Sequence, residues 1–364
     1  MRDIVDGIAA WHAAGQPFAI ATVVQTWKSA PRQPGAAMAV SAGGDVLGSV
    51  SGGCVEGAVY EAAREVLASG QARLETYGVS DDDAIEVGLT CGGIIDVFVA
   101  PADAEHYPEL AEVLSAVQAR RPVAVASTVS GATTLGRHLF VWPDRVSGSL
   151  GSEGLDVAVA EQAQGMLSHG STGVVRLGPD GEQRRDEVGV FVQSFAPPPR
   201  MLVFGAIDFA AAVARIGKFL GYHVTVCDAR PVFATPKRFP DVDELVVKWP
   251  HQYMSEVDVD ERTVICVLTH DPKFDVPLLE RALQTPAGYI GAMGSRRTHE
   301  DRLRRLREIG VDEKALARVA SPIGLDLGAR TPEETAVAVA AEIIALNWGG
   351  SGRRLSDLEL PIHR

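Results

Sequence analysis

The sequence predicts an α/β protein, with a duplicated mixed α/β domain in its N-terminal part and a Rossmann-like, doubly wound parallel sheet in its C-terminal part. First, 364 residues exceed what one ordinary hydrophobic core needs. Second, Ala196-Pro197-Pro198-Pro199-Arg200 has the composition of a stiff, extended linker. Third, short apolar runs alternate with helical patterns after this linker, as in folds with a parallel sheet. We therefore expect domains over residues 1–196 and 200–364.

The N-terminal part begins with an amphipathic helix, because Ile4, Ile8 and Trp11 share one helical face and Gly15 ends the pattern. Apolar runs between proline-rich and Gly-Gly turns then predict strands, and an alanine-rich pattern predicts a second helix that stops at Gly70. The expected elements are a helix over residues 2–14, strands over 18–24, 37–40 and 46–50, and a helix over 55–68.

A second copy of residues 17–101 is indicated at residues 122–197, although the abundance of alanine and valine favours some matches by chance. The copies differ where the first has Gly52-Gly53-Cys54 and the second has Ser152-Glu153-Gly154. Elements needed only for folding should persist in both copies, whereas a ligand site is needed once. We therefore expect the site on the first copy and a scaffold role for the second.

The C-terminal part alternates strand and helix patterns, as a doubly wound sheet requires. Its last helix has a well-formed start, with Thr331 as the cap, Pro332 at the first position and two glutamates in the first turn. The expected strands cover residues 201–204, 224–227, 244–247, 263–268 and 288–290, and the expected helices cover 209–220, 276–283 and 296–309.

Composition excludes several classes of protein. With 46% hydrophobic and 22% charged residues, the composition is typical of a globular protein, and the net charge of -13 argues against binding to nucleic acid or to an anionic membrane surface. The dense basic run from Arg302 to Arg307 is typical of a solvated helix face. No apolar run approaches the roughly 18 residues that span a bilayer, and four cysteines without metal spacing favour a reducing cytoplasm.

Two turns combine cysteine with glycine. In Gly48-Ser49-Val50-Ser51-Gly52-Gly53-Cys54-Val55-Glu56, a strand runs through glycines into a helix start, where unpaired main-chain N–H groups attract anions and favour a thiolate. Two plainer interpretations remain, with Cys54 as a small packed hydrophobe and Glu56 as an acid in the first helical turn. Cys91-Gly92-Gly93 forms the second turn, in which the flanking residues leave the cysteine accessible.

The positions of Gly205 and Asp228 suggest a dinucleotide-binding site, whereas the residues at 207 and 208 argue against one. Gly205 follows the first strand of the C-terminal part, and Asp228 ends the next strand, where an acid that binds ribose would lie. However, Ile207 stands where a second glycine would let the backbone approach a pyrophosphate, and Asp208 adds negative charge beside it. NAD(P) binding is therefore possible but disfavoured by Ile207.

Two further turns follow strands of the same predicted sheet, at the edge where ligands of such sheets bind. His270 and Asp271 form one pair, and a lone histidine and aspartate at such a turn are more often polar loop residues than catalysts. Gly294, Ser295 and Arg296 form the other, where glycine, hydroxyl, guanidinium and a helix start together favour a phosphate.

Taken together, these segments resemble the XdhC/CoxI family of accessory proteins for molybdenum hydroxylases. The chain departs from the family at Ile207 and Asp208, where a glycine and often a histidine are expected. The matching segments are Ser29-Ala30-Pro31-Arg32 with Pro34-Gly35, Gly48 to Glu56, Cys91-Gly92-Gly93, Thr269-His270-Asp271, Tyr289 to Arg297, Ser321 to Gly328, and Thr331-Pro332-Glu333-Glu334.

The resemblance implies a protein that binds the molybdenum cofactor, shields it while its terminal sulfido ligand is installed, and hands it to an apo-hydroxylase. Molybdopterin presents a metal, a pterin and a phosphate, so it requires a soft ligand, main-chain donors and an anion site. We assign Cys91 to the metal, with Cys54 as the second choice, the glycine turns with Arg32 to the pterin, and Ser295 with Arg296 to the phosphate. The expected cofactor-binding residues are Cys91, Cys54, Gly52, Gly53, Glu56, Gly92, Gly93, Arg32, Gly205, Asp228, His270, Asp271, Gly294, Ser295 and Arg296.

We therefore expect a cytoplasmic, homodimeric cofactor chaperone and not a turnover enzyme. Its expected partners are a hydroxylase of the xanthine dehydrogenase type and a cofactor sulfurase or nucleotidyltransferase. The alternative is an NAD(P)-dependent oxidoreductase built on the C-terminal fold, which micromolar NAD(P)(H) binding with hydride transfer would reveal. A third interpretation is an adaptor that brings a sulfurase to its client, and it predicts a purified protein without cofactor.

Overall fold

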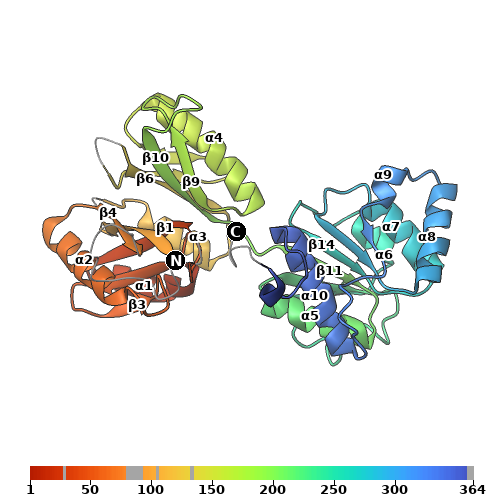
Figure 1. The fold of residues 1–364 in the computed structure, drawn as a ribbon. Coiled ribbons are helices and arrows are strands. Elements are labelled where there is room, and N and C mark those ends of the chain that lie inside the picture. The colour runs from red at the N-terminus through yellow and green to blue at the C-terminus, as the bar shows by residue number, and fades with distance from the viewer. Residues whose placement is uncertain (28–29, 79–92, 104–105, 132–134, 359–364) are drawn as a thin grey trace. The chain divides into compact units, whose positions relative to one another are not determined.

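The computed structural model describes residues 1–27, 30–78, 93–103, 106–131 and 135–358, and these form two compact units, one of residues 1–197 and one of residues 198–358 (Figure 1). The predicted α/β class is confirmed, with antiparallel sheets in the first unit and a parallel sheet in the second.

The first sheet has the strand order β3-β2-β1-β5-β4, and every pair that β1 makes is antiparallel. Strand β1 runs to Trp27, beyond the expected end at residue 24, because it pairs with β5 as far as Ile94 across an irregularity between Val23 and Gln25. Helix α2 covers one face of the sheet with Val59, Ala63 and Val66 among its buried residues. The elements are β1 Phe18–Trp27, β2 Ala37–Ser41, β3 Val46–Gly48, α2 Glu56–Ser69, β4 Arg73–Gly78 and β5 Ile94–Pro101.

The second sheet repeats this topology, with the order β8-β7-β6-β10-β9 and a covering helix α4 in the same place in the sequence. The duplication expected from the sequence is therefore present in the strand order. Helix α3, which sequence patterns did not predict, precedes the second copy. The elements are α3 Leu110–Gln118, β6 Val123–Ser130, β7 His138–Val141, β8 Val146–Gly148, α4 Glu153–His169, β9 Gly173–Leu177 and β10 Val188–Phe195.

The core of the first unit lies between the two sheets and under each covering helix. One buried cluster joins Phe18 and Ile20 of β1 to Val125 and Phe140 of the second copy, together with residues of helices α1, Val5–Ala13, and α3. Separate apolar clusters lie beneath α2 and beneath α4. Burial of these apolar side chains on both faces of each sheet fixes how the copies face one another.

The second unit is a parallel sheet of order β13-β12-β11-β14-β15-β16, which confirms the Rossmann-like expectation. The order reverses between β11 and β14, so a ligand of such a sheet is expected at the carboxyl ends of these two strands. The strands are β11 Arg200–Phe204, β12 His223–Cys227, β13 Glu244–Val246, β14 Val264–Val267, β15 Tyr289–Ala292 and β16 Val319–Ala320; the helices are α5 Asp208–Phe219, α6 Pro250–Met254, α7 Pro272–Ala282, α8 Arg296–Glu308, α9 Glu313–Leu316 and α10 Pro332–Trp348.

Helix starts follow local capping rules. Helix α7 begins four residues before the expected position 276, because Asp271 caps it through the N–H of Lys273 and Pro272 occupies its first turn. Helix α10 begins as predicted, with a reciprocal capping box between Thr331 and Glu334. Among the residues placed in the structure, no helix combines the length and apolar character that crossing a membrane requires.

Candidate functional site

The turn between β3 and α2 is organised around the carboxylate of Glu56. Its two oxygens accept hydrogen bonds from the N–H groups of Ser51 at 2.9 Å, Gly52 at 3.0 Å and Gly53 at 2.8 Å. The hydroxyls of Ser49 and Ser51 donate to the same carboxylate, each at 2.6 Å. We expected these main-chain donors to face a ligand; in the structure they already have an anionic partner within the chain.

This environment stabilises the charged form of Glu56. Partial burial raises the pKa of the carboxyl group, but hydrogen bonds from Ser49, Ser51 and the main chain outweigh burial and lower the pKa to about 2. The carboxylate therefore stays ionised over the whole physiological pH range. Its hydrogen bonds to Ser51, Gly52 and Gly53 fix the conformation of the glycine turn.

Cys54 follows this network directly. Its N–H donates to the hydroxyl of Ser51 at 3.0 Å, and its side chain is half-buried beside the apolar cluster under α2. Gly93 is buried and directly precedes β5. Cys91 and Gly92, to which we assigned the metal and part of the pterin site, lie outside the described residues.

Arg32 lies in the loop between β1 and β2 and forms an ion pair with Asp3 at 3.0 Å. Its side chain is 39% exposed, so the guanidinium still reaches solvent. The structure thus brings Gly52, Gly53, Cys54 and Glu56 into one turn, while Arg32 is engaged with Asp3 near the N-terminus.

In the second unit, Gly205 is required by its surroundings. Its φ of +106° favours glycine, and a Cβ placed on it would approach Cγ2 of Thr269 to 2.9 Å. The turn after β11 therefore passes close to the turn after β14. This close approach places Gly205 beside the segment that carries His270 and Asp271.

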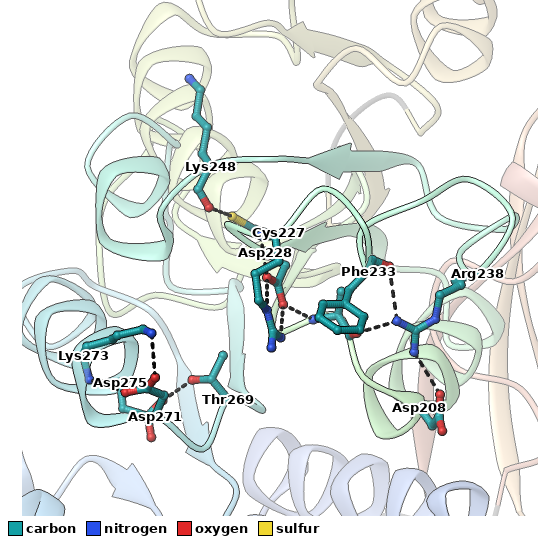
Figure 2. A network of polar contacts seen from close by, with 12 residues as sticks. Asp208, Cys227, Asp228, Phe233, Arg238, Lys248, Thr269, Asp271, Lys273 and Asp275 are labelled. Atoms are coloured by element: carbon teal, nitrogen blue, oxygen red, sulfur yellow. Dashed lines mark hydrogen bonds and ion pairs between the residues drawn. The ribbon is translucent and has the colours of Figure 1, made fainter.

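Asp228, expected to bind a ribose, is fully engaged by the chain. Its buried carboxylate accepts hydrogen bonds from the N–H of Ala206 at 2.7 Å and from Nε and Nη2 of Arg230 at 2.9 and 2.8 Å, as Figure 2 shows for the region around Asp228. Burial raises the pKa of Asp228, but the Arg230 guanidinium and the main-chain donors give a net lowering. A ribose would have to compete with these partners.

Sequence reasoning missed three residues near Asp228, namely Arg230, Phe233 and Arg238. The guanidiniums of Arg230 and Arg238 lie 4.5 and 5.8 Å from the centroid of the Phe233 ring. Arg238 also donates to the carbonyl of Ala206 at 3.0 Å and to Asp208 at 3.0 Å (Figure 2). The signal available in the sequence was an arginine two positions after Asp228, which directly follows β12.

A buried ion pair contacts the turns that follow β14 and β15. Arg302 of α8 donates to Asp275 of α7 at 2.8 Å and to the carbonyl of Met293 at 2.9 Å. Asp275 also contacts the hydroxyl of Thr269, and Figure 2 shows this contact. Both charged side chains are nearly inaccessible, at 3% and 4% exposed. The expectation of a fully solvated basic face on this helix is therefore wrong at Arg302, because tertiary contact with α7 buries that position.

The remaining predicted residues lie at helix starts. His270 is exposed, and Asp271 caps α7 and pairs with Lys273 at 3.0 Å. Ser295 caps α8 through the N–H of Thr298 at 3.1 Å, next to the exposed Arg296. Gly294 precedes the cap with a φ of +149°. The cap, the helix dipole and the guanidinium make this turn suited to an anion.

Comparisons with known proteins cover both units. The model of the "XdhC and CoxI family" matches residues 11–78 and 116–178, and the model described as "XdhC Rossmann domain" matches residues 201–343. A Bacillus subtilis protein with the name of a probable xanthine dehydrogenase subunit is 30% identical over 331 residues, which cover 89% of this chain and 92% of that protein. The molybdenum cofactor insertion chaperone PaoD of Escherichia coli is 26% identical over 333 residues, 92% of this chain and 84% of PaoD.

A similar fold is found in a crystal structure described as a xanthine dehydrogenase from Bacillus halodurans. It superposes with a TM-score of 0.70, covers 98% of each chain and is 23% identical in sequence. At this level of identity the likeness establishes the fold alone.

Proposed function

This chain belongs to the XdhC and CoxI family, and from that premise we propose that it is a chaperone that binds the molybdenum cofactor and inserts it into a molybdenum hydroxylase of the xanthine dehydrogenase type. The observation that carries the proposal is the similarity to a named insertion chaperone over 92% of this chain, which includes both units. The cofactor is the cargo of such a protein.

We propose that different turns of the chain bind different parts of the cofactor. In the first copy, Glu56 already saturates the main-chain donors around Gly52 and Gly53, so a cofactor phosphate would have to displace a carboxylate that resists protonation. This turn is therefore better suited to present Cys54 than to bind an anion. The metal end of the cargo requires a soft thiolate, which we assign to Cys91 with Cys54 as the second candidate.

The phosphate belongs, in this proposal, to the start of α8. Ser295 and Arg296 are exposed there, and the first turn of a helix of 13 residues adds main-chain donors and a positive dipole. Gly294 allows the backbone to turn ahead of the cap. Arg32, Gly92 and Gly93 remain assigned to the pterin. His270 remains assigned to the carboxyl edge of the parallel sheet in the second unit.

We further propose that the protein protects the cofactor during sulfuration and meets a sulfurase or a nucleotidyltransferase as well as its hydroxylase client, as a homodimer. Two observations weigh against the competing nicotinamide-dependent oxidoreductase. Ile207 occupies the place of a fingerprint glycine, and the carboxylate of Asp228 is taken by Arg230 and Ala206.

The direct test is retention of molybdopterin cofactor after gel filtration of the full chain. We expect the wild type to retain the cofactor, Cys91→Ala to lose most of it, and Cys266→Ala to retain it, because Cys266 is buried in the second unit and burial raises its pKa to about 12. Failure of the wild type to retain cofactor would overturn the proposed function. Equal retention by the wild type and Cys91→Ala would leave the function standing and remove Cys91 from the site.

A further inference from the structure

A cavity of about 40 Å³ lies between the two sheets of the first unit. Its walls come from β1 and β5 of the first copy and from β6, β7 and β10 of the second. Most of the wall is apolar, and the polar side chains that reach it include Thr22, Ser127 and His138. Thr22 pairs with Ala37 in the first sheet as Ser127 pairs with His138 in the second, so the cavity lies where equivalent strands of the copies face each other.

His138 gives this cavity a specific hydrogen-bonding group. Its Nδ1 lies 2.8 Å from the hydroxyl of Ser127, and its ring stacks on Tyr107 with centroids 4.4 Å apart. The residue is only 9% exposed, and its Nε2 has no hydrogen-bond partner among the residues that the structure describes. Burial, with a smaller contribution from His106, lowers the pKa of His138 to about 4, so the ring is neutral near pH 7.

The fold itself does not require an imidazole at this position. Ala37 holds the equivalent place in the first copy. There the same pair of strands forms with only a fully buried methyl side chain at this position. A polar atom buried without a partner is unfavourable, and such atoms in folded proteins usually meet a protein group, a water or a ligand. His138 is therefore a feature of the second copy alone, and its contacts with Ser127 and Tyr107 leave Nε2 without a hydrogen-bond partner among the described residues.

We infer that this cavity is a binding site for a small neutral molecule of two or three heavy atoms that hydrogen-bonds Nε2 of His138. The cavity volume of about 40 Å³ limits the size of the bound molecule, because one water needs roughly 10–15 Å³ of such space. The apolar wall excludes ions, whose burial without a counter-charge is unfavourable. A molecule with both a donor and an acceptor suits either tautomer of the ring and reaches the hydroxyls of Thr22 and Ser127, so occupancy would link β1 of one copy to β6 of the other.

Formamide is a suitable probe, since it has three heavy atoms, one acceptor and one donor group. The ring nitrogens of the full chain, labelled with ¹⁵N-histidine, are followed by NMR as formamide is added. We expect a saturable shift of the His138 Nε2 resonance and none at the exposed His270 in the other unit. A His138 signal that does not move would overturn the inference. So would a drift of the His138 and His270 signals together without saturation, because that would be a general solvent effect.

Two variants separate binding from a general solvent effect. Ala100→Leu places a larger side chain in the wall and is expected to abolish the shift. Thr22→Val keeps the size of the side chain, removes one hydroxyl and is expected to weaken formamide binding by about two- to tenfold. The other histidine resonances report whether each variant folds, and unchanged formamide binding in a folded Ala100→Leu protein would refute the site.

Discussion

Glu56 and Asp156 hold equivalent places in the two copies, and each accepts a hydrogen bond from the main chain two residues after the preceding strand ends. Glu56 accepts from Val50 at 3.2 Å, and Asp156 accepts from Leu150 at 2.6 Å. A contact kept in both copies indicates a role in folding. The longer side chain of Glu56 also reaches Gly52 and Gly53, and these contacts distinguish the first copy.

Replacing Glu56 should therefore destabilise the first unit. Glu56→Gln removes the charge that several donors share, and we expect a loss of about 1–2 kcal/mol in the free energy of unfolding. Asp156→Asn is the matched control in the second copy, where an amide oxygen can still accept from Leu150, and its loss should be smaller. Denaturant titration of both variants gives the comparison, and equal losses would contradict a special role for Glu56.

The pH dependence follows from the same residue. Because the folded pKa of Glu56 lies at about 2, below the reference value of 4.5, its contribution to stability is present above pH 4.5 and is lost as the pH falls toward 2. We expect the wild type to lose more stability over this interval than Glu56→Gln. Thermal unfolding at a series of pH values measures the difference, and parallel curves for the two proteins would refute the assignment.

The architecture was accessible from the sequence because it depends on local patterns. Apolar runs of strand length, glycine stops and the cap at Thr331 indicate the elements where they occur, and the alternation after Pro199 indicates the parallel sheet. The repeated strand order was visible as a repeated sequence pattern. The miss at α3 and the early start of α7 concern boundaries and short elements, for which local patterns are weakest.

The site was less accessible, because its contacts join residues with no fixed spacing. Nothing local indicates that the carboxylate of Glu56 folds back onto Gly52 and Gly53. Likewise, Arg302 lies in a basic run that looks solvated, and only its contact with Asp275, 27 positions earlier, buries it. Residue type predicted which groups carry charge, whereas tertiary structure decides which of these groups already have partners.

The ion pair of Asp275 and Arg302 should be critical for the second unit. Arg302→Met would leave the Asp275 carboxylate buried without its counter-charge, and we expect a loss of about 3–5 kcal/mol in the free energy of unfolding. Arg304→Met on the exposed face of the same helix should cost much less, because solvent screens its ion pairs. Denaturant unfolding measures both, and similar losses would show that the buried pair is not special.

Gly205 should not tolerate a side chain. In Gly205→Ala, the new methyl group would meet Thr269 in a backbone conformation that favours glycine, and we expect a loss of about 2–4 kcal/mol. Gly221→Ala is the matched control, since Gly221 has a φ of +84° with no atom within 4 Å of an added Cβ, and it should lose only about 1 kcal/mol. Thermal denaturation of the two variants separates steric contact from backbone strain, and equal losses would remove the contact with Thr269 from the account.

Arg296 should contribute to cofactor retention without contributing to stability. Its guanidinium is exposed at the first position of α8, where it adds to the helix dipole in attracting a phosphate, so we expect Arg296→Ala to weaken binding of molybdopterin cofactor by about tenfold. The unfolding free energy should stay within about 0.5 kcal/mol of the wild type, because the side chain is on the surface. Arg304→Ala, on the same helix but away from its start, is the matched control for the loss of one positive charge. If both variants weaken cofactor binding equally, general electrostatic attraction accounts for the loss and the phosphate lies elsewhere. If only Arg296→Ala weakens binding, the charge acts at the start of α8.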